Sequence, residues 1–532
     1  MEHQRYQVVI VGGGPVGVAL AVDLGQRGIS CALVERHLEP QRIPKGQNLT
    51  ARTLEHFYFW GCVDELRAAR VLPPGYPIGG LTAYGDLMSD YWFVQSDPVG
   101  RGGGRSFYFQ ANERLPQYLT EEVLRTRLNQ FPNVTQLFGW SAETIEQDDN
   151  AARVRVVEVD GPGEMLLEAD YIAGCDGGRS TVREQMGIER SNADLDDRMV
   201  LTVFRSRELH KGLERFPDRT TYRVLHPDFK GHWQFFGRVD VGEGWFFHAP
   251  VPKGTTTENY DFLGLMQKAA GFPFAATFDY VGFWDLRISV ADRYREGRVF
   301  IAGDASHTHP PYGGFGLNTG LEDATNLAWK LAGALQGWGG EPLLASYSEE
   351  RRPIFAETGE AMIAGGIEND REFLERYDPE RNREEFERAW EKLKAHSGTR
   401  QQSYEPHYEG SSVVMGPPGA KCSIHGKHTH AAQAGHHLAP QLLSSGRNVF
   451  EELGPDFTLL AFGADEPAVA AIEAGAAALR LPLKVIRDSF EDGRTAYEAR
   501  LTLVRPDQFV AWTGETTPVD ARGLLAKVAG LA

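Results

Sequence analysis

A glycine-rich turn between a short apolar strand and a helix constrains the fold of this chain more than any other feature. Residues Tyr6–Val11 (YQVVIV) form an apolar run with β-branched residues, which predicts a buried parallel strand. The turn Gly12–Gly17 (GGGPVG) follows, and Pro15–Gln26 carries apolar residues at helical spacing. Ser30–Val34 predicts a second buried strand. Strand, turn, helix and strand make a βαβ unit, which places both strands parallel in one sheet.

The spacing GxGxxG in this turn suits the binding of a dinucleotide. Gly12 allows the tight turn, Gly14 lets a pyrophosphate approach the backbone, and Gly17 lets helix and sheet pack closely. The start of the helix offers unpaired N–H groups and the positive end of its dipole. Glu35, which ends the second strand, can accept hydrogen bonds from a ribose. The unit predicts a dinucleotide site, and a glycine-rich packing turn is the structural alternative.

A second motif lies in residues 170–183 (DYIAGCDGGRSTVR). A strand ends there at Asp176-Gly177, and a helix begins near Ser180. An ordinary strand-turn-helix with an N-terminal cap explains this segment equally well.

A third motif lies in residues 298–331, where a strand leads to Gly303-Asp304. Pro310-Pro311 then fixes the backbone, and the glycines that follow remove side chains where it must lie against something flat. The helix beginning near Leu317 points its positive end at this place, which suits an anionic reduced flavin. The structural alternative is a glycine-rich loop between a strand and a helix.

The three motifs occur in one order and at one approximate spacing, and together they resemble those of a known family. The family is that of the single-component (class A) FAD-dependent aromatic hydroxylases, the group of para-hydroxybenzoate and phenol hydroxylases. The likeness covers roughly residues 5–375, and the tail, best at residues 499–512 (ARLTLVRPDQFVAW), resembles the thioredoxin-like C-terminal domain of the phenol hydroxylase branch.

The resemblance implies an α/β fold with a Rossmann-like FAD-binding domain of the glutathione-reductase type, an inserted β-sheet substrate domain and a small thioredoxin-like domain without CxxC. We expect the first part of the FAD domain at residues 1–190 and the substrate domain at 191–290. The second part of the FAD domain, with connecting helices, is expected at 291–400, and the thioredoxin-like domain at 401–532.

The resemblance also implies which residues contact FAD. Glu35 would take the adenosine ribose and Asp304 the ribityl hydroxyls, whereas the Asp176 motif would serve both FAD and the nicotinamide cofactor. Lys45 stands where the family usually has an Arg, and a Lys cannot form the same forked contact. The expected cofactor-binding residues are Gly12, Gly14, Pro15, Gly17, Glu35, Arg36, Lys45, Gln117, Asp176, Asp304, Pro311, Gly316, Leu317 and Asn318.

Candidate catalytic and substrate residues rest on weaker signals. Pro311 is expected beside the isoalloxazine, and Gln47 occupies the position where the phenol hydroxylase branch has an acidic residue. Arg287 precedes the third motif and is a candidate for a contact with a phenolic oxygen, with a salt bridge as the alternative. Further substrate candidates, each with a plain structural role as the alternative, are Tyr222, His232 and Tyr312.

The implied reaction is the hydroxylation of a phenolic or polycyclic aromatic small molecule. NADH or NADPH would reduce the flavin, O2 would add at C4a, and the C4a-hydroperoxyflavin would transfer an OH group to the ring. The single strong GxGxxG fits a nicotinamide cofactor that has no Rossmann domain of its own. Baeyer–Villiger insertion on the same fold and a flavin-binding protein without turnover remain alternatives; the WxWxIP signature of flavin-dependent halogenases is not found.

Composition and net charge limit which binding partners and which compartment we expect for this chain. Lys and Arg number 55 against 73 Asp and Glu, a net charge of −18, which argues against nucleic acid. The four cysteines are far apart and form no CxxC, which fits a reducing cytoplasm. No signal peptide and no membrane span are expected. A thioredoxin-like appendage is compatible with a homodimer.

The histidines at 425–437 lack accompanying Cys or carboxylates, so we expect a solvated loop there and no metal.

Overall fold

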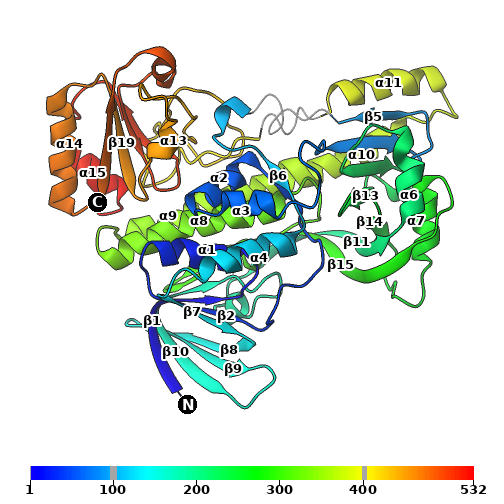
Figure 1. The fold of residues 1–532 in the computed structure, drawn as a ribbon, viewed down its shortest axis with the longest axis horizontal. Coiled ribbons are helices and arrows are strands. Elements are labelled where there is room, and N and C mark those ends of the chain that lie inside the picture. The colour runs from blue at the N-terminus through cyan, green and yellow to red at the C-terminus, as the bar shows by residue number, and fades with distance from the viewer. Residues whose placement is uncertain (1, 96–104, 398–403) are drawn as a thin grey trace.

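A computed structural model describes residues 2–95, 105–397 and 404–532, and three sheets organise them (Figure 1). The first sheet has the order β16-β17-β10-β1-β2-β7. Its central strand β1 (Glu2–Val11) pairs in parallel with β10 (Glu164–Gly174) and with β2 (Cys31–Glu35). The remaining strands are β7 (Val134–Phe138), β16 (Arg295–Glu296) and β17 (Val299–Ile301).

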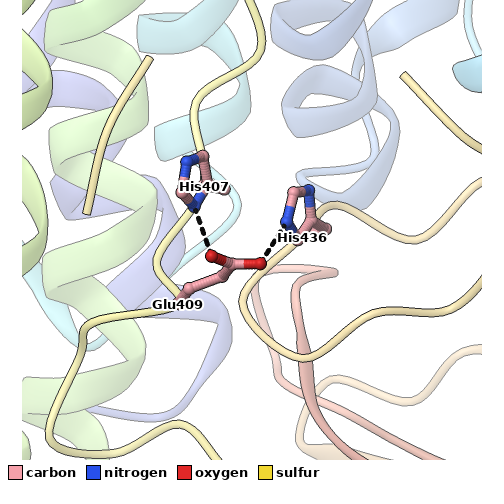
Figure 2. Close-up of side chains that lie close together, drawn as sticks. All are labelled: His407, Glu409 and His436. Atoms are coloured by element: carbon pink, nitrogen blue, oxygen red, sulfur yellow. Dashed lines mark hydrogen bonds and ion pairs between the residues drawn. The ribbon is translucent and has the colours of Figure 1, made fainter. Parts of the chain in front are cut away.

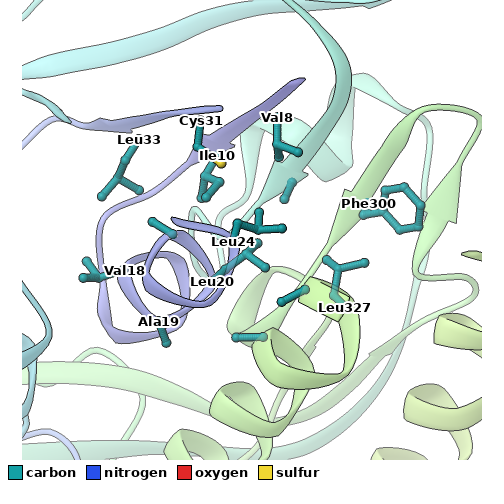
Figure 3. Close-up of a cluster of buried hydrophobic side chains, with 14 of the residues drawn as sticks. Val8, Ile10, Val18, Ala19, Leu20, Leu24, Cys31, Leu33, Phe300 and Leu327 are labelled. Atoms are coloured by element: carbon teal, nitrogen blue, oxygen red, sulfur yellow. The ribbon is translucent and has the colours of Figure 1, made fainter. Parts of the chain in front are cut away.

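The predicted βαβ unit is confirmed, and it forms the main hydrophobic core. Val8 and Ile10 of β1 are fully buried against α1 (Pro15–Gln26) and α8 (Phe315–Gln336). Leu20 and Leu24 of α1 lie close to Leu327 of α8 in this core (Figure 3). The last four residues of β1 are all buried, and neighbouring residues of a strand point to opposite faces, so both faces of β1 are covered there, as the uninterrupted apolar run predicts.

An antiparallel β-meander branches from this sheet. β8 (Trp140–Gln147) pairs antiparallel with β9 (Ala152–Glu158), and β9 pairs antiparallel with β10. In Figure 1 these strands lie on the side of the sheet away from α1 and α8.

The second sheet has the order β18-β15-β11-β14-β13-β12-β4-β5. It draws on more of the chain than the predicted residues 191–290, because β4 pairs in parallel with β12, far along the sequence, and no local pattern encodes that pairing. The strands of this sheet are β4 (Gly80–Tyr84), β5 (Trp92–Val94), β11 (Arg190–Arg205), β12 (Thr221–Leu225), β13 (Gln234–Arg238), β14 (Gly244–Val251), β15 (Thr277–Ala291) and β18 (His307–Thr308).

Two separate apolar clusters cover the two faces of this sheet. On the outer face, Phe236 and Phe247 pack beneath α6 (Arg207–Gly212) and α7 (Phe262–Ala270). On the other face, Phe235 and Phe246 pack toward the first sheet's helices, and we call this the inner face. The alternation of neighbouring residues between the faces follows from the two-residue period of a strand.

Further helices lie between the strands. α2 (Ala51–Phe59) and α3 (Val63–Ala68) are separate helices, because Gly61 between them has a φ of +69°. α4 (Gln117–Leu128) precedes β7, and α8 begins two residues before the predicted Leu317. α9 (Glu341–Glu357), α10 (Gly365–Arg376) and α11 (Arg383–Ala395) follow α8. Within the described ranges, no helix is both long and apolar enough to cross a membrane.

The third sheet is C-terminal and has the order β20-β19-β21-β22. β19 (Phe457–Phe462) pairs in parallel with β20 (Leu483–Asp488) after the crossover helix α14 (Glu466–Leu479). The hairpin β21 (Leu501–Val504) and β22 (Val510–Gly514) and the helix α15 (Ala521–Val528) complete a thioredoxin-like topology.

A buried network of charged side chains connects this C-terminal domain to the helices α8 and α9. The Arg505 guanidinium, in the turn between β21 and β22, donates to both oxygens of Glu350 on α9 at 2.7 and 2.8 Å. Lys330 of α8 donates to Glu350 at 2.7 Å, and Asp507 accepts from Arg505 at 2.6 Å. All four side chains are completely buried, and two positive charges balance two negative ones. Despite burial, the positive charges of Arg505 and Lys330 hold the pKa of Glu350 well below its usual range.

Glu350→Gln should therefore destabilise the protein strongly. The amide keeps the shape but leaves two buried positive charges, Arg505 and Lys330, with Asp507 as the one remaining negative charge of the network, and breaking a buried pair in this way costs about 3–5 kcal/mol. Thermal unfolding followed by tryptophan fluorescence suits the test, because Trp329 donates to Asp507 at 3.1 Å. The control is Glu349→Gln, an exposed neighbour on the same helix, expected to cost less than about 1 kcal/mol. Equal melting temperatures for the two variants would contradict the assignment.

Candidate functional site

The glycine-rich turn sits at the carboxyl end of β1, where the second motif packs against it. Gly12 has a φ of +106°, and a Cβ on it would lie 2.3 Å from the carbonyl oxygen of Cys175. A Cβ on Gly17 would lie 1.9 Å from the carbonyl oxygen of Gly12. Both positions therefore require glycine for the fold itself.

Gly14 differs from them, because nothing in the described structure explains why it lacks a side chain. Its φ of −70° is open to any residue, and a Cβ built on it meets no atom within 4 Å. It is also the N-terminal cap residue of α1, whose first N–H groups have no partner within the helix. The open space over Gly14, next to a helix N-terminus, fits a phosphate group.

The Glu35 carboxylate lies directly beside this turn. It accepts hydrogen bonds from the backbone N–H of Gly13 at 2.6 Å and from that of His37 at 2.8 Å. A carboxylate has about four lone-pair positions, so capacity remains for the two hydroxyls of a ribose. Arg36, the next residue, is exposed.

Asp176 of the second motif caps a helix. Its carboxylate accepts from the Ser180 hydroxyl at 2.5 Å and from the Val182 N–H at 3.1 Å, at the start of α5 (Thr181–Gln185). Burial raises the pKa of this carboxyl, and the hydrogen bonds oppose that shift. The cap is the structural role that the sequence already allowed, and it places Gly177 and Gly178 beside the third motif.

Arg190, at the start of β11, joins the second and third motifs, and the sequence analysis did not single it out. Its guanidinium donates to the carbonyl oxygen of Gly178 at 2.7 Å and to that of Asp304 at 3.5 Å. The Asp304 residue itself is exposed, yet the surrounding protein desolvates its carboxylate and raises its pKa, against the effects of His307, Lys45 and Arg190. Access to solvent together with strong desolvation is expected of a group that lines a cleft.

The loop at residues 45–48 joins Lys45 and Gln47 to the start of α8. A Cβ on Gly46 would lie 3.1 Å from Leu317 and 3.3 Å from the Gln117 side-chain oxygen, so these residues lie together. The amide nitrogen of Gln117 donates to Glu121 at 3.0 Å. Gln47 is 6% exposed, and within the described residues its side-chain nitrogen has no hydrogen-bond partner.

Asn318 uses its side chain to hold the start of α8 in place. Its oxygen accepts from the Thr50 N–H at 2.9 Å and from the Thr53 hydroxyl at 2.7 Å. Its nitrogen donates to the carbonyl oxygens of Asn48 at 2.8 Å and Gly314 at 2.6 Å. Only the backbone N–H groups of this first turn, which includes Gly316 and Leu317, are left to face a ligand.

These residues fit the FAD that the family resemblance implies. The open turn at Gly14 and the Glu35 carboxylate would hold its pyrophosphate and adenosine ribose, and Asp304, Lys45 and the α8 N-terminus would face its flavin end. The Gln47 side-chain nitrogen is a buried donor without a hydrogen-bond partner in the described structure. Pro311, half-buried, lies in the turn that leads into α8.

The inner face of the second sheet lies next to these candidate cofactor residues. Its cluster contains Phe235, Phe246 and Trp284 from the sheet together with Ile43, Tyr312 and Phe315 from the segments around the third motif and the loop. His248 of β14 lies among these rings, with centroids 4.8 Å from Phe235 and 4.9 Å from Trp284. The sequence analysis missed His248, although the alternation in GWFFHAP places it on the same face as Phe246.

The predicted substrate residues do not lie together on the inner face. Tyr312 belongs to the inner-face cluster, where its hydroxyl accepts from the Trp233 N–H at 3.1 Å. Tyr222 lies on the outer face and accepts a hydrogen bond from Arg238 at 3.1 Å. Arg287 is exposed between two inner-face residues of β15 and so points away from that face. His232 is buried just before β13.

Comparisons with known proteins agree with this geometry. Residues 5–361 match the family described as FAD binding domain, and residues 432–531 match the family described as aromatic-ring hydroxylase, C-terminal. A 4-methyl-5-nitrocatechol 5-monooxygenase of a Burkholderia species is 30% identical over 97% of this chain and 96% of its own. The rebeccamycin biosynthetic enzyme RebC with reduced flavin superposes with a TM-score of 0.84 and 26% identity over 100% of both chains. The flavin-dependent monooxygenase PieE, in complex with FAD and substrate, shows the same fold at a TM-score of 0.84 and 24% identity over 100% of both chains.

Gly14→Ala should separate cofactor binding from folding. The added methyl group enters space that the protein leaves open, so the FAD-free melting temperature should stay unchanged, while FAD affinity should fall at least about tenfold. Fluorescence titration of the FAD-free protein with FAD measures this. Gly17→Ala is the contrasting variant, because its Cβ would collide with the Gly12 carbonyl oxygen and lower the melting temperature without FAD as well. Unchanged FAD affinity in Gly14→Ala would refute the phosphate position.

Proposed function

Because the chain belongs to the family of FAD-dependent aromatic-ring hydroxylases, we propose that it hydroxylates a phenolic or polycyclic aromatic molecule bound against the inner face. FAD supplies the activation of O2 with electrons from NADH or NADPH. The observation that supports the proposed position is the apolar cluster that joins the sheet's rings to Tyr312 and to Phe315, which begins α8 beside the candidate cofactor residues.

The inner face suits the flat faces of an aromatic substrate. Phe235 and Phe246 stand edge to face at 6.0 Å, and Trp284 packs against the same cluster. Aromatic rings prefer such offset or edge-to-face contacts, and each pair contributes about 0.5–1.5 kcal/mol beyond the area that it buries. The same apolar surroundings keep water from the reacting atoms, which protects a reactive oxygen species from loss.

His248 is the group that we propose to bind the ring hydroxyl. Burial lowers its pKa to about 3, so the imidazole is uncharged near neutral pH. Among the described residues, neither its Nδ1 nor the Trp284 Nε1 has a hydrogen-bond partner. A buried polar atom without a partner costs about 1–3 kcal/mol, and a hydroxyl placed there removes that cost. With so low a pKa, His248 orients the oxygen through a hydrogen bond and does not take up its proton.

We propose that Gln47 and Pro311 lie on the side of the substrate position that faces the cofactor. The Gln47 amide can donate a hydrogen bond but cannot act as a base, so it orients a substrate or cofactor oxygen without removing a proton. Tyr222 and Arg287 do not lie on the inner face, and we propose no substrate contact for them.

The compartment that we propose is the cytoplasm, because all four cysteines are unpaired thiols. The homodimer stays a prediction from the thioredoxin-like appendage.

A panel of phenols, naphthols and hydroxyquinones tests the proposed function in the FAD-loaded protein. At least one compound should raise the rate of NADH or NADPH oxidation severalfold and yield a product heavier by one oxygen atom. That atom should carry the label when 18O2 is supplied. A product with an ester or lactone would favour Baeyer–Villiger insertion instead. If no compound raises the oxidation rate, the hydroxylase proposal fails.

His248→Leu tests the hydroxyl contact with the substrate found in that panel. The variant keeps an apolar face but removes the hydrogen bond, so KM should rise about tenfold, and more reducing cofactor should be consumed per hydroxylated product. His248→Asn places an amide near the former Nδ1 and should lose less. A substrate analogue with the hydroxyl methylated should bind wild type and His248→Leu alike. Equal KM values for the parent substrate in wild type and His248→Leu would disprove the contact.

A further inference from the structure

A group of histidines and carboxylates lies outside the flavin site, in the segment before the third sheet. His407 and Glu409 lie two residues apart, and His436 approaches them from a neighbouring stretch of chain (Figure 2). Neither family match covers residues 362–431, so His407 and Glu409 fall between the two matched regions. The sequence analysis expected the histidines of 425–437 to be solvated, but His436 is 5% exposed because Glu405 and Glu409 enclose its ring.

The three side chains present donor atoms to one small volume. The Glu409 Oε1 lies 3.0 Å from His436 Nε2, and its Oε2 lies 3.7 Å from His407 Nδ1. All three ligand atoms lie within 4.8 Å of one another. Four ligand atoms at about 2.1 Å from a zinc ion stand about 3.4 Å apart in a tetrahedron, and each Glu409 oxygen lies near that distance from one imidazole nitrogen.

A fourth side chain, Glu405, contacts His436 on the ring edge opposite Glu409. Glu405 Oε1 lies 3.4 Å from the Nδ1 of His436, on the side of the ring away from Glu409. A carboxylate that accepts from one ring nitrogen fixes the other nitrogen as a metal ligand, and metal-bound histidines are commonly held in this way. Within the described residues, His407 Nδ1 and Glu405 Oε2 are buried atoms without a hydrogen-bond partner.

Charge balance also favours a cation. Glu405 and Glu409 contact opposite nitrogens of the His436 ring, so two carboxylates face one small volume. The rings of His407 and His436 are parallel, with centroids 4.9 Å apart, so both imidazoles border the same volume. A divalent ion bound by neutral imidazoles would place positive charge beside both carboxylates.

The backbone around the donors is well braced. The His407 N–H donates to the Ser423 carbonyl at 2.8 Å, and the Ser423 N–H donates back at 3.1 Å. The carbonyl oxygen of His436 accepts from the Val510 N–H at 2.9 Å, which ties this ligand to β22. A metal site needs donors held by a frame of this kind.

We propose that His407, Glu409 and His436 bind a zinc ion, with Glu405 orienting His436 and a water molecule in the fourth position. Two imidazoles and a carboxylate suit zinc, and the ion bridges segments that are 27 residues apart in sequence (409 to 436). Tyr408, between two of the ligands, accepts from Arg351 at 2.8 Å, and Arg351 donates to Asp323 at 2.7 Å. The ion thereby stabilises the connection between the flavin domain and the C-terminal domain. It takes no part in hydroxylation.

The test uses the FAD-loaded full chain, purified without a polyhistidine tag, stripped with a chelator and then supplied with Zn²⁺. After gel filtration the wild type should keep about one equivalent of zinc per chain by elemental mass spectrometry. Co²⁺ in its place should give ligand-field bands at wavelengths longer than the flavin absorption. Added Zn²⁺ should also raise the melting temperature.

His436→Gln and Glu409→Gln should lose the bound metal and the cobalt bands. Glu409→Gln keeps the shape and a hydrogen-bond acceptor, so its flavin content should match that of wild type and exclude misfolding. Glu405→Gln should weaken zinc about 10–100-fold. The matched control is His425→Gln, an exposed histidine in the same segment, which should bind zinc like wild type. A wild type that retains no zinc, or equal retention in wild type, Glu409→Gln and His436→Gln, would overturn the proposal.

Discussion

The carboxylate of Asp323 is the interaction on which the flavin site depends. It is completely buried on α8, where it accepts from the Gly303 N–H at 3.0 Å and binds His307 at 2.6 Å. Its other oxygen accepts from Arg351 at 2.7 Å. Burial raises the pKa of this carboxyl, but the partners His307 and Arg351 outweigh it and hold the pKa below its usual value. One charge thus fixes the third motif, α8 and α9 relative to one another.

Much of the fold follows from local patterns. The run Tyr6–Val11 and the glycine turn predict the central βαβ unit, since burial of both faces of a strand leaves apolar residues at consecutive positions. The pairing of β4 with β12 could not be predicted in this way, because it joins segments far apart in sequence. The Arg505–Glu350 network is similarly hidden, since a charged residue in a sequence gives no sign that it will be buried beside its partner.

The residues of the candidate site also differ in whether a local sequence pattern can predict them. The candidate cofactor residues lie in contiguous motifs whose glycines and acidic residues have a steric or hydrogen-bonding reason that can be read locally. The candidate substrate residues come from separate strands, and which of them can face a ligand depends on the face that each side chain occupies. Tyr222 and His248 illustrate this: both are polar aromatic groups in the same sheet, yet one lies on the outer face and the other on the inner face.

The buried charges between Arg505 and Glu350 also bear on how the proposed substrate would reach the inner face. Separating such a pair would leave uncompensated ions in a dry interior, at a cost of about 3–5 kcal/mol. The C-terminal domain is therefore firmly fixed to α9. For a bulky aromatic molecule, we expect entry to the inner face to depend on segments that are held by weaker contacts.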